Sequence, residues 1–583
     1  MTIGHAKLRR KKSTFNDGIS DKDRASFICY KSGEAGKGLK QMKFKKSTAG
    51  DWHLALEMAS TYGAFKIGGA GSKESGAVFD LTSSSVAVAG FVLSVPTKET
   101  SVLKLTTQMI SKVTTKLPGR KQVSQLSSGN LATSHDKFPT VLGVQLDVTM
   151  AGSTTVGKVR DALLPVLLGR AASSVSGLPT YVVGPKSTRY LVRLQTLLRK
   201  DGRYLIMGGV AESKMAGDVK KATGIHLDDL SNGTGLAQAK DKDTVECDPF
   251  KLQSTAKADI IWVVDESGSM SDNRLDVANN ANDFFSLALK SGLDFRMAVT
   301  NVVDPSDSKY KGAVGRFCSK QYAFDASGKL TKSSDAYDMG GTDRFLLPTE
   351  QKIFKSCVLN PPGYEGGSEF GLYNAYKAVT NHLPRKANTP GKIRPDATLV
   401  IIVATDELPA SITDIFNPWV IIELQNCVIS KTTTDWILKT KYKKDMDLYS
   451  GKSSYGKAAE AVMHTIGGVC NNTCGADIAH GYTEISQALG GQVGDVCQKN
   501  LGKTLQLIIN SISGQSSPAI LEYVPISASL AVALGKNVLT RSRVKGFDYN
   551  AKNNTLVFIG TKFAKGDQVV ASYRRWVQQE IIK

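Results

Sequence analysis

Two apolar runs in the middle of the chain end abruptly in acidic and hydroxyl residues. The run 259–264 stops at Asp265, and the run 397–405 stops at Asp406. Continuous apolar runs that are partly β-branched predict central strands buried on both faces of a sheet. Each strand would therefore deliver a polar loop at its carboxyl end, which is where ligands bind in open α/β sheets.

A helical period follows the first of these loops. Val277, Ala281, Phe284 and Ala288 recur at helical spacing, so strand, loop and helix come in the order of a βα unit. Further strands are predicted over 294–303, 461–466 and 492–497, and further helices over 370–383, 475–489 and 501–513. This alternation predicts an α/β domain over residues 255–514, with a doubly wound, mostly parallel sheet of the Rossmann-like type.

Outside residues 255–514 the apolar period is that of strands. Residues 51–139 form a β-rich region without a functional signal, residues 140–254 a β-rich unit with a helix over 154–168, and residues 515–583 a C-terminal strand region. The last of these is short for an independent sandwich, so we expect it to pack on 140–254. The α/β domain would then be inserted in, or flanked by, β-rich domains.

The first loop has the form Asp-x-Ser-x-Ser, filled by Asp265, Ser267 and Ser269. One carboxylate and two hydroxyls suit a hard divalent cation that takes oxygen ligands, Mg²⁺ first, with Mn²⁺ or Ca²⁺ as alternatives. Because hydroxyls carry no charge, the ion would stay under-neutralised and attract one more carboxylate from a partner. The alternative is a Ser-rich turn in which the acid caps the next helix.

The stretch Asp-Glu-Ser-Gly-Ser-Met at 265–270 resembles the first motif of the metal-ion-dependent adhesion site of the von Willebrand factor A (VWA) family. The resemblance implies a VWA-type fold, with a Thr from a second loop and an Asp from a third loop completing the site. Asp406 fits the third position. For the second, Thr342 has the expected chemistry, whereas Ser368 has the better position before a predicted helix and is alternatively only its N-cap. The lead-in and the tail of this region are similar to predicted exported VWA proteins of myxobacteria.

Charge is concentrated at the start of the chain. The formal net charge is +21, and residues 1–50 hold 13 Lys and Arg against 4 Asp and Glu. This region is either a basic arm that contacts an anionic surface or a solvated flexible tail. No apolar run approaches the roughly 20 residues that span a bilayer, and no secretory signal is visible after the first charges.

The eight cysteines indicate disulfides rather than a metal site. They are even in number, and Cys470 and Cys474 lack the spacing of a zinc knuckle or a redox pair. Disulfides form in oxidising compartments, so we expect an extracytoplasmic protein at the cell surface, in the periplasm or secreted. Scattered buried thiols are the alternative.

Together these patterns favour a metal-dependent adhesion or protein-interaction module, not an enzyme, that binds a protein or surface ligand with an exposed carboxylate. A structural subunit of a surface assembly is an alternative. A Mg²⁺-dependent hydrolase is a weaker one, since it needs a general base beside the metal. The motifs supply only Glu266, Glu369 and Glu407 for that role.

Overall fold

The chain divides into two compact units in the computed structural model. Unit 1 comprises Met1–Thr255 and Ser517–Lys583, and unit 2 comprises Ala256–Ser516. The predicted basic arm lies outside the described residues, except for 45–49. The structure describes residues 45–49, 52–56, 61–67, 74–82, 86–130, 141–171, 175–176, 184–199, 202–238, 241–251, 256–290, 293–308, 310–320, 342–362, 369–413, 422–426, 429–470, 472, 474–498, 501–517, 519–535, 537–561 and 567–577.

Unit 2 is built on strands that all pair in parallel, in the order β14-β13-β15-β16-β17. Near-continuous burial of β13 and β15 is what their apolar runs require. Because neighbouring parallel strands end on the same edge, the residues after β13 and β15 meet there. The strands are β13 (Lys257–Val264), β14 (Asp294–Thr300), β15 (Thr398–Ala404), β16 (Ala461–Gly467) and β17 (Val493–Asp495).

Alternate residues of β13 belong to two hydrophobic clusters. Ile260, Trp262 and Val264 pack with residues of α7, α8 and α15, whereas Ile261 and Val263 pack with residues of α9, α13 and α14. The helices therefore cover both faces of the strand. They are α7 (Ser271–Lys290), α8 (Gln351–Leu359), α9 (Gly371–Asn381), α10 (Ala410–Thr413), α12 (Lys431–Trp436), α13 (Lys443–Tyr449), α14 (Tyr482–Ala488) and α15 (Gly502–Ser516).

Unit 1 holds an antiparallel sheet in the order β6-β7-β9-β10-β5-β4-β3-β8. Most of its strands are long, and β4–β5 and β9–β10 are antiparallel pairs of strands that follow each other in the sequence. They are β3 (Thr61–Ile67), β4 (Ser75–Thr82), β5 (Ala87–Pro96), β6 (Arg120–Asn130), β7 (Val141–Thr154), β8 (Val175–Ser176), β9 (Ser187–Leu198) and β10 (Arg203–Glu212).

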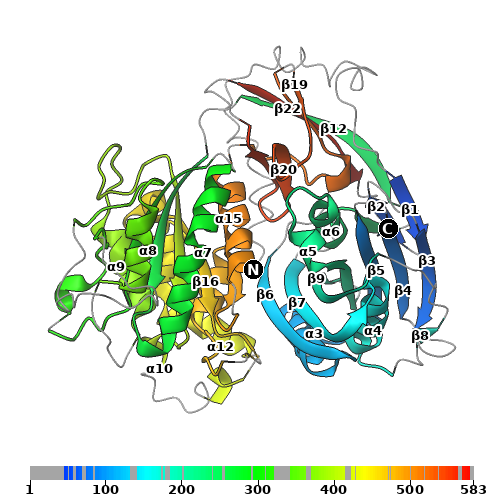
Figure 1. The fold of residues 1–583 in the computed structure, drawn as a ribbon, viewed down its shortest axis with the longest axis horizontal. Coiled ribbons are helices and arrows are strands. Elements are labelled where there is room, and N and C mark those ends of the chain that lie inside the picture. Colours follow the sequence, from blue (N-terminus) through cyan, green and yellow to red (C-terminus); the bar gives the residue numbers. More distant parts are fainter. Residues whose placement is uncertain are drawn as a thin grey trace. The chain divides into compact units, whose positions relative to one another are not determined.

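Helices pack against this sheet either through apolar faces or over glycines of the strands. Helices α3 (Val102–Lys116) and α4 (Val156–Leu168) bury their apolar faces in the main core of the unit (Figure 1). Helix α6 (Thr223–Ser231) packs on β5 and β10 where these strands carry Gly90 and Gly209. A Cβ at either glycine would lie within 2.7 Å of a methyl group of Leu230, so the absent side chains allow the close approach.

The C-terminal segment is bound to the rest of unit 1 by strand pairing and by buried polar contacts. β12 (Lys242–Lys251) pairs with β22 (Gln568–Val577) in the sheet β12-β22-β18-β19. The Arg541 guanidinium donates to both oxygens of Asp229 on α6 at 2.7 and 2.8 Å. The other strands are β1 (Lys45–Ala49), β2 (Trp52–Leu56), β11 (Leu236–Gln238), β18 (Ala531–Leu534), β19 (Asn537–Leu539), β20 (Gly546–Asn550) and β21 (Thr555–Ile559), and α5 is Ser213–Gly217.

The fold class expected from the sequence is wrong for the chain. We expected an α/β protein with a doubly wound, mostly parallel sheet, but the strands are mixed and mostly antiparallel. Among the strands that the structure describes, parallel ladders are confined to the five of unit 2. The error arose because the strand-loop-helix pattern around Asp265 dominated the interpretation, whereas most strands of the chain lie in the hairpin-connected sheets of unit 1.

The predicted disulfides are confirmed. Cys318 is bonded to Cys357, and Cys474 to Cys497. Cys247 and Cys470 are also disulfide-bonded, while Cys29 and Cys427 lie outside the described residues. These bonds are consistent with an extracytoplasmic protein. None of the helices in the described ranges is long and apolar enough to cross a membrane.

Candidate metal centre

The structure brings four of the predicted ligands together at the carboxyl ends of β13 and β15. The backbone N–H of Ser267 donates to Asp265 Oδ1 at 2.8 Å, and the Oγ atoms of Ser267 and Ser269 lie 2.9 Å apart. Ser269 Oγ in turn donates to Asp406 Oδ1 at 3.2 Å. Asp265, Ser267, Ser269 and Asp406 therefore form one chain of contacts, which we call the serine loop site.

The spacing of these oxygen atoms suits a small divalent ion. Neighbouring ligands of an octahedral Mg²⁺ with bonds of about 2.0–2.1 Å lie about 2.9 Å apart. The separations of 2.9 and 3.2 Å along the chain of contacts are close to that edge length. Ser269 is exposed, so an ion held there would face solvent or a ligand. Two carboxylates and two hydroxyls are also the donor types that Mg²⁺ prefers.

Two residues that the sequence analysis missed hold the loop in place. Thr405 Oγ1 donates to Asp265 Oδ2 at 2.7 Å. The guanidinium of Arg274, on the first turn of α7, donates to the carbonyl oxygens of Asp265 at 2.9 Å and Ser267 at 2.7 Å. Thr405 directly precedes Asp406, so its position in the motif could have identified it. Nothing in the sequence pattern distinguishes Arg274 from an ordinary helix surface residue.

Glu266 anchors the loop to the segment that follows β14. Its side chain is buried, and Oε2 accepts the backbone N–H of Val302 at 3.0 Å. Burial raises the pKa of Glu266 to about 8, and the nearby charge of Asp265 acts in the same direction. The raised pKa favours the protonated form at neutral pH, and the side chain serves as a structural link between the loop after β13 and the segment after β14.

The carboxylates of the site destabilise one another. Burial raises the pKa of Asp265, although hydrogen bonds from Thr405 and Ser267 oppose the rise. The pKa of Asp406 is raised first by burial and then by the charge of Asp265. For Glu369, burial and the carboxyl group of Glu407 raise the pKa to about 9. Positive charge at this edge of the sheet would relieve all three effects.

The loop before α9 lies beside these acids. Phe370 N donates to Val302 O at 2.7 Å, and Ala410 N donates to Glu369 O at 2.8 Å. These bonds tie the start of α9 to the loops that follow β14 and β15. Ser368, one candidate for the second-loop ligand, precedes Glu369 but lies outside the described residues, so its role stays a prediction.

Thr342, the other candidate, belongs to a different group of contacts. Its side chain is exposed, and its carbonyl accepts a hydrogen bond from Ser319 Oγ. The adjacent Asp343 bonds His382 Nε2 at 3.0 Å and Arg316 Nε at 3.2 Å. Among the contacts of the described residues, none joins Thr342 to the serine loop site.

Two of the three candidate bases for hydrolysis, Glu266 and Glu369, have raised pKa values. Burial raises the pKa of Glu266 and of Glu369, and the carboxyl group of Glu407 adds to the rise at Glu369. A general base must be able to accept a proton at the working pH. The raised pKa therefore argues against Glu266 as the base. In the ranges described, no group of three or more His, Cys, Asp or Glu side chains is arranged to hold a metal ion, so the serine hydroxyls are essential to the candidate site.

Comparisons with known proteins give no family. No family model matches the chain, and no curated protein matches it. Among solved structures it is similar to the pilus adhesin SpaC from Lactobacillus rhamnosus GG, with 14% identity and a TM-score of 0.24 over 58% of this chain and 43% of that chain. The open conformation of the same adhesin gives 13% identity and a TM-score of 0.26 over 59% and 42%. The matched part is thus less than half of the adhesin, and likeness at this level supports no argument about function.

Proposed function

We propose that unit 2 is a divalent-cation-dependent binding module. Asp265, Ser267, Ser269 and Asp406 would hold Mg²⁺, or Mn²⁺ or Ca²⁺, and the ion would bind a carboxylate of a protein or surface ligand. The observation that carries this proposal is the chain of contacts at the ends of two adjacent parallel strands. The resemblance of residues 265–270 to the VWA adhesion site belongs to the same proposal.

The electrostatics of the site favour this function. Asp265, Asp406 and Glu369 all have raised pKa values, and no arginine or lysine makes an ion pair with them among the described contacts. A bound cation would lower the cost of their burial. The bound ion would supply a positive point that attracts a ligand carboxylate, while the chain's own residues orient it. With its disulfides, the protein would act at the cell surface, in the periplasm or as a secreted protein.

Calorimetric titration of the full chain with Mg²⁺, Mn²⁺ and Ca²⁺ tests the proposal. We expect the wild type to bind at least one ion and Ser269→Ala to lose that binding, because Ser269 joins the loop to Asp406. Ser271→Ala is the matched control, since Ser271 is also exposed but begins α7 beyond the site. At about 100 times the dissociation constant, the ion should stabilise unit 2 by about 2.7 kcal/mol. Equal binding by Ser269→Ala and the wild type would contradict the proposal.

The ligand class requires a second measurement, because a chain with a net charge of +21 is attracted to any anionic surface. We expect the full chain to bind a carboxymethylated dextran surface more strongly in Mg²⁺ than in EDTA. This difference should vanish in Ser269→Ala, which keeps the charge of the chain. Binding that is identical in Mg²⁺ and EDTA would show simple charge attraction and refute the carboxylate ligand.

A further inference from the structure

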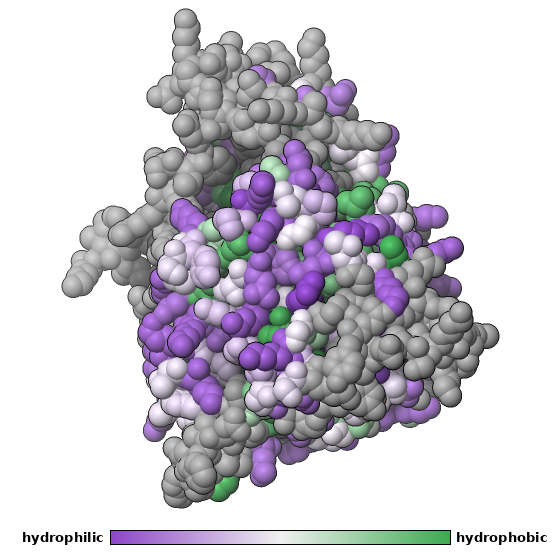
Figure 2. Space-filling view, turned by 90° about the vertical axis from the view of Figure 1, so that its left-hand side faces the viewer, coloured by the Kyte–Doolittle hydropathy of each residue, from purple (hydrophilic) through white to green (hydrophobic). Residues whose placement is uncertain are grey.

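Hydrophilic residues cover most of the coloured surface in Figure 2, where hydrophobic residues form only small separate spots. Isolated exposed apolar residues are normal on soluble proteins. A more concentrated apolar surface lies inside unit 1, in a cavity of about 370 Å³ between α6 and the segment 530–547. The residues that line it all belong to unit 1, and none of them is part of the serine loop site.

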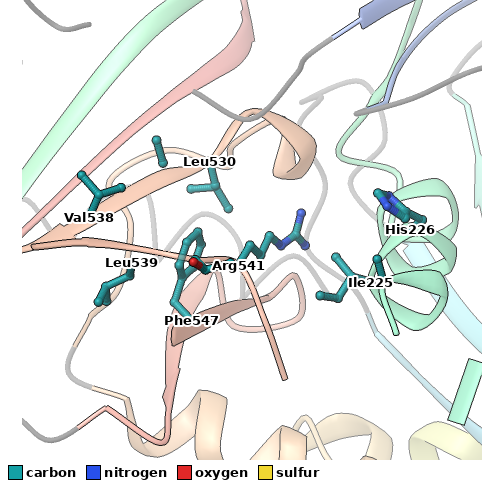
Figure 3. A pocket seen from close by; sticks show the side chains of 10 residues that line it. Ile225, His226, Leu530, Val538, Leu539, Arg541 and Phe547 are labelled. Carbon is teal, nitrogen blue, oxygen red and sulfur yellow. The ribbon is translucent and has the colours of Figure 1, made fainter. Parts of the chain in front are cut away.

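The cavity combines apolar walls with one buried cation. Figure 3 shows Ile225 on the side of α6 and Leu530, Val538, Leu539 and Phe547 on the opposite side, with the Arg541 guanidinium pointing between them. Most of the lining is hydrophobic, which is typical of sites for small apolar ligands. Arg541 is thus the main group that could orient a ligand.

Arg541 retains one donor beyond its protein contacts. A guanidinium has five N–H groups. Nε donates to Asp548 at 3.3 Å, Nη1 to Asp229 at 2.7 Å and to the carbonyl of Ser527 at 3.0 Å, and Nη2 to Asp229 at 2.8 Å. The second N–H of Nη2 has no partner among the described residues. Because the side chain of Arg541 is only 1% exposed, this donor is desolvated and gains from an acceptor inside the cavity.

The charges around the cavity cancel, which selects against a charged ligand. Burial lowers the pKa of His226, so this lining residue is neutral at neutral pH. A charged ligand would lose its hydration without meeting an uncompensated opposite charge. The charged groups are three arginines and three aspartates: Arg193, Arg541, Arg543, Asp228, Asp229 and Asp548.

We propose that this cavity binds an apolar group about the size of a phenyl ring that carries one neutral hydrogen-bond acceptor, such as a carbonyl oxygen. The volume is at the small end of ligand sites, which span roughly 300–1,000 Å³. The acceptor would take the remaining N–H of Arg541, and the apolar walls would bury the ring. Either a free small molecule or a side chain of an extended peptide could supply this group. A peptide is a possible source because β19, whose Val538 lines the cavity, is the last strand of its sheet, and an extended peptide can pair with such an edge strand.

Fluorine NMR of para-fluoroacetophenone with the full-length protein tests the proposal. We expect the protein to broaden the ketone signal. Fluorobenzene, which lacks the acceptor, and para-fluorobenzoate, which is charged, should each bind about tenfold more weakly. Absence of broadening with the ketone, or equal binding of all three probes, would overturn the proposal.

Two matched variants locate the binding. Val538 lines the cavity and is 50% exposed, whereas Val544 is 46% exposed and does not line it. Both tolerate a charge because both reach solvent. We expect Val538→Glu to abolish binding of the ketone and Val544→Glu to leave it unchanged. The same effect in both variants would mean that the ketone binds elsewhere.

A competition experiment with a short peptide distinguishes the two sources of the ligand. The probe is acetyl-Ser-Val-Phe-Val-Ser-amide, added in competition with the ketone. Displacement of the ketone supports a peptide ligand that adds backbone pairing along β19. Failure to displace it, with ketone binding intact, supports a free small molecule. This outcome does not depend on the metal proposal, because Ser269 is not one of the residues that line the cavity.

Discussion

Buried carboxylates in the two units have opposite electrostatic environments. In unit 1, burial would raise the pKa of Asp548, but Arg543 and Arg541 reverse the effect and hold it below its usual value. In unit 2, burial raises the pKa values of Asp265 and Asp406, and the neighbouring carboxylates add to the rise. Asp548 and Asp265 are both buried aspartates, yet the first is stabilised as an anion and the second is destabilised.

The difference shows which group of carboxylates is already neutralised by arginines and which is not. In unit 1, arginines and aspartates form a network without net charge that links the C-terminal segment to α6. No additional charged group is needed to neutralise it. In unit 2 the acids gather at a strand edge without such partners among the described residues. A cluster of this kind is costly unless a cation binds, which is why we assign the external ligand to unit 2.

The largest expected effect comes from breaking the neutral network. Arg541→Met would leave Asp229 and Asp548 buried without their main partner, and should destabilise unit 1 by about 3–5 kcal/mol. Urea unfolding, with hydrogen exchange in the segment from β18 to β22, measures the loss. Arg574→Met is the control: its pair with Asp243 is 37% exposed at the arginine, so about 1 kcal/mol or less is expected. Equal losses in both variants would show that the buried network is no more important than a surface pair.

A pH titration tests whether the partner, rather than the unit, decides the sign of the shift. Asp248 in unit 1 has no arginine partner among the described contacts, and it accepts hydrogen bonds from Glu522 N and Tyr573 Oη, both at 2.7 Å. Burial raises its pKa from 3.8 to about 7. The folded state therefore holds this proton more tightly than the unfolded state, so its stabilising contribution is complete below pH 3.8 and lost as the pH rises through about 7.

Asp248→Asn should remove that pH dependence. We expect the free energy of unfolding of unit 1 to fall between these two pH values in the wild type and to vary less in the variant. Urea unfolding at a series of pH values, followed by hydrogen exchange in β12 and β22, measures both slopes. A slope that persists in Asp248→Asn would assign the pH dependence to other groups and weaken the comparison.

The smallest expected effect concerns packing beside the serine loop site. A Cβ at Gly371 would lie 2.4 Å from Tyr482 Oη, and the Tyr482 side chain is fully buried. Gly371→Ala should therefore destabilise unit 2 by about 1–3 kcal/mol through overpacking. Tyr482→Phe removes the oxygen, leaving ring carbons at 3.2 Å, so the double variant should recover most of the loss. Thermal unfolding of the four proteins gives the coupling, and simple additivity would contradict the contact.

The local part of the candidate site was predictable from the sequence. Asp265, Ser267 and Ser269 lie within one turn after an apolar run, and Asp406 follows a second run of the same kind. The contact between these two loops then depends only on the two strands being parallel neighbours, which their composition indicated. Thr342 shows the limit of this reasoning. Its hydroxyl suits a metal ligand, but the contacts of its loop join Thr342 to Ser319 and Asp343 to His382.

The wrong fold class has a related cause. Apolar periodicity predicts strands but not their partners, so the periodicity of residues 51–250 did not give the antiparallel order that the structure shows. The pairing of β12 with β22 and the contact between Asp229 and Arg541, which are 312 residues apart, are equally invisible along the chain. Such contacts depend on which buried surfaces meet, not on local propensity.

The sequence by itself determined where strands end in acids, which hydroxyls follow them and that the cysteines would pair, because each of these is a local property of residue type and spacing. Only the tertiary structure decided which carboxylates gain an arginine and which do not. It also formed the apolar cavity beside Arg541 from segments on both sides of unit 2 in the chain. The physical reason is that burial and pairing of charge depend on three-dimensional neighbours, and the free energy of a charge is set by those neighbours.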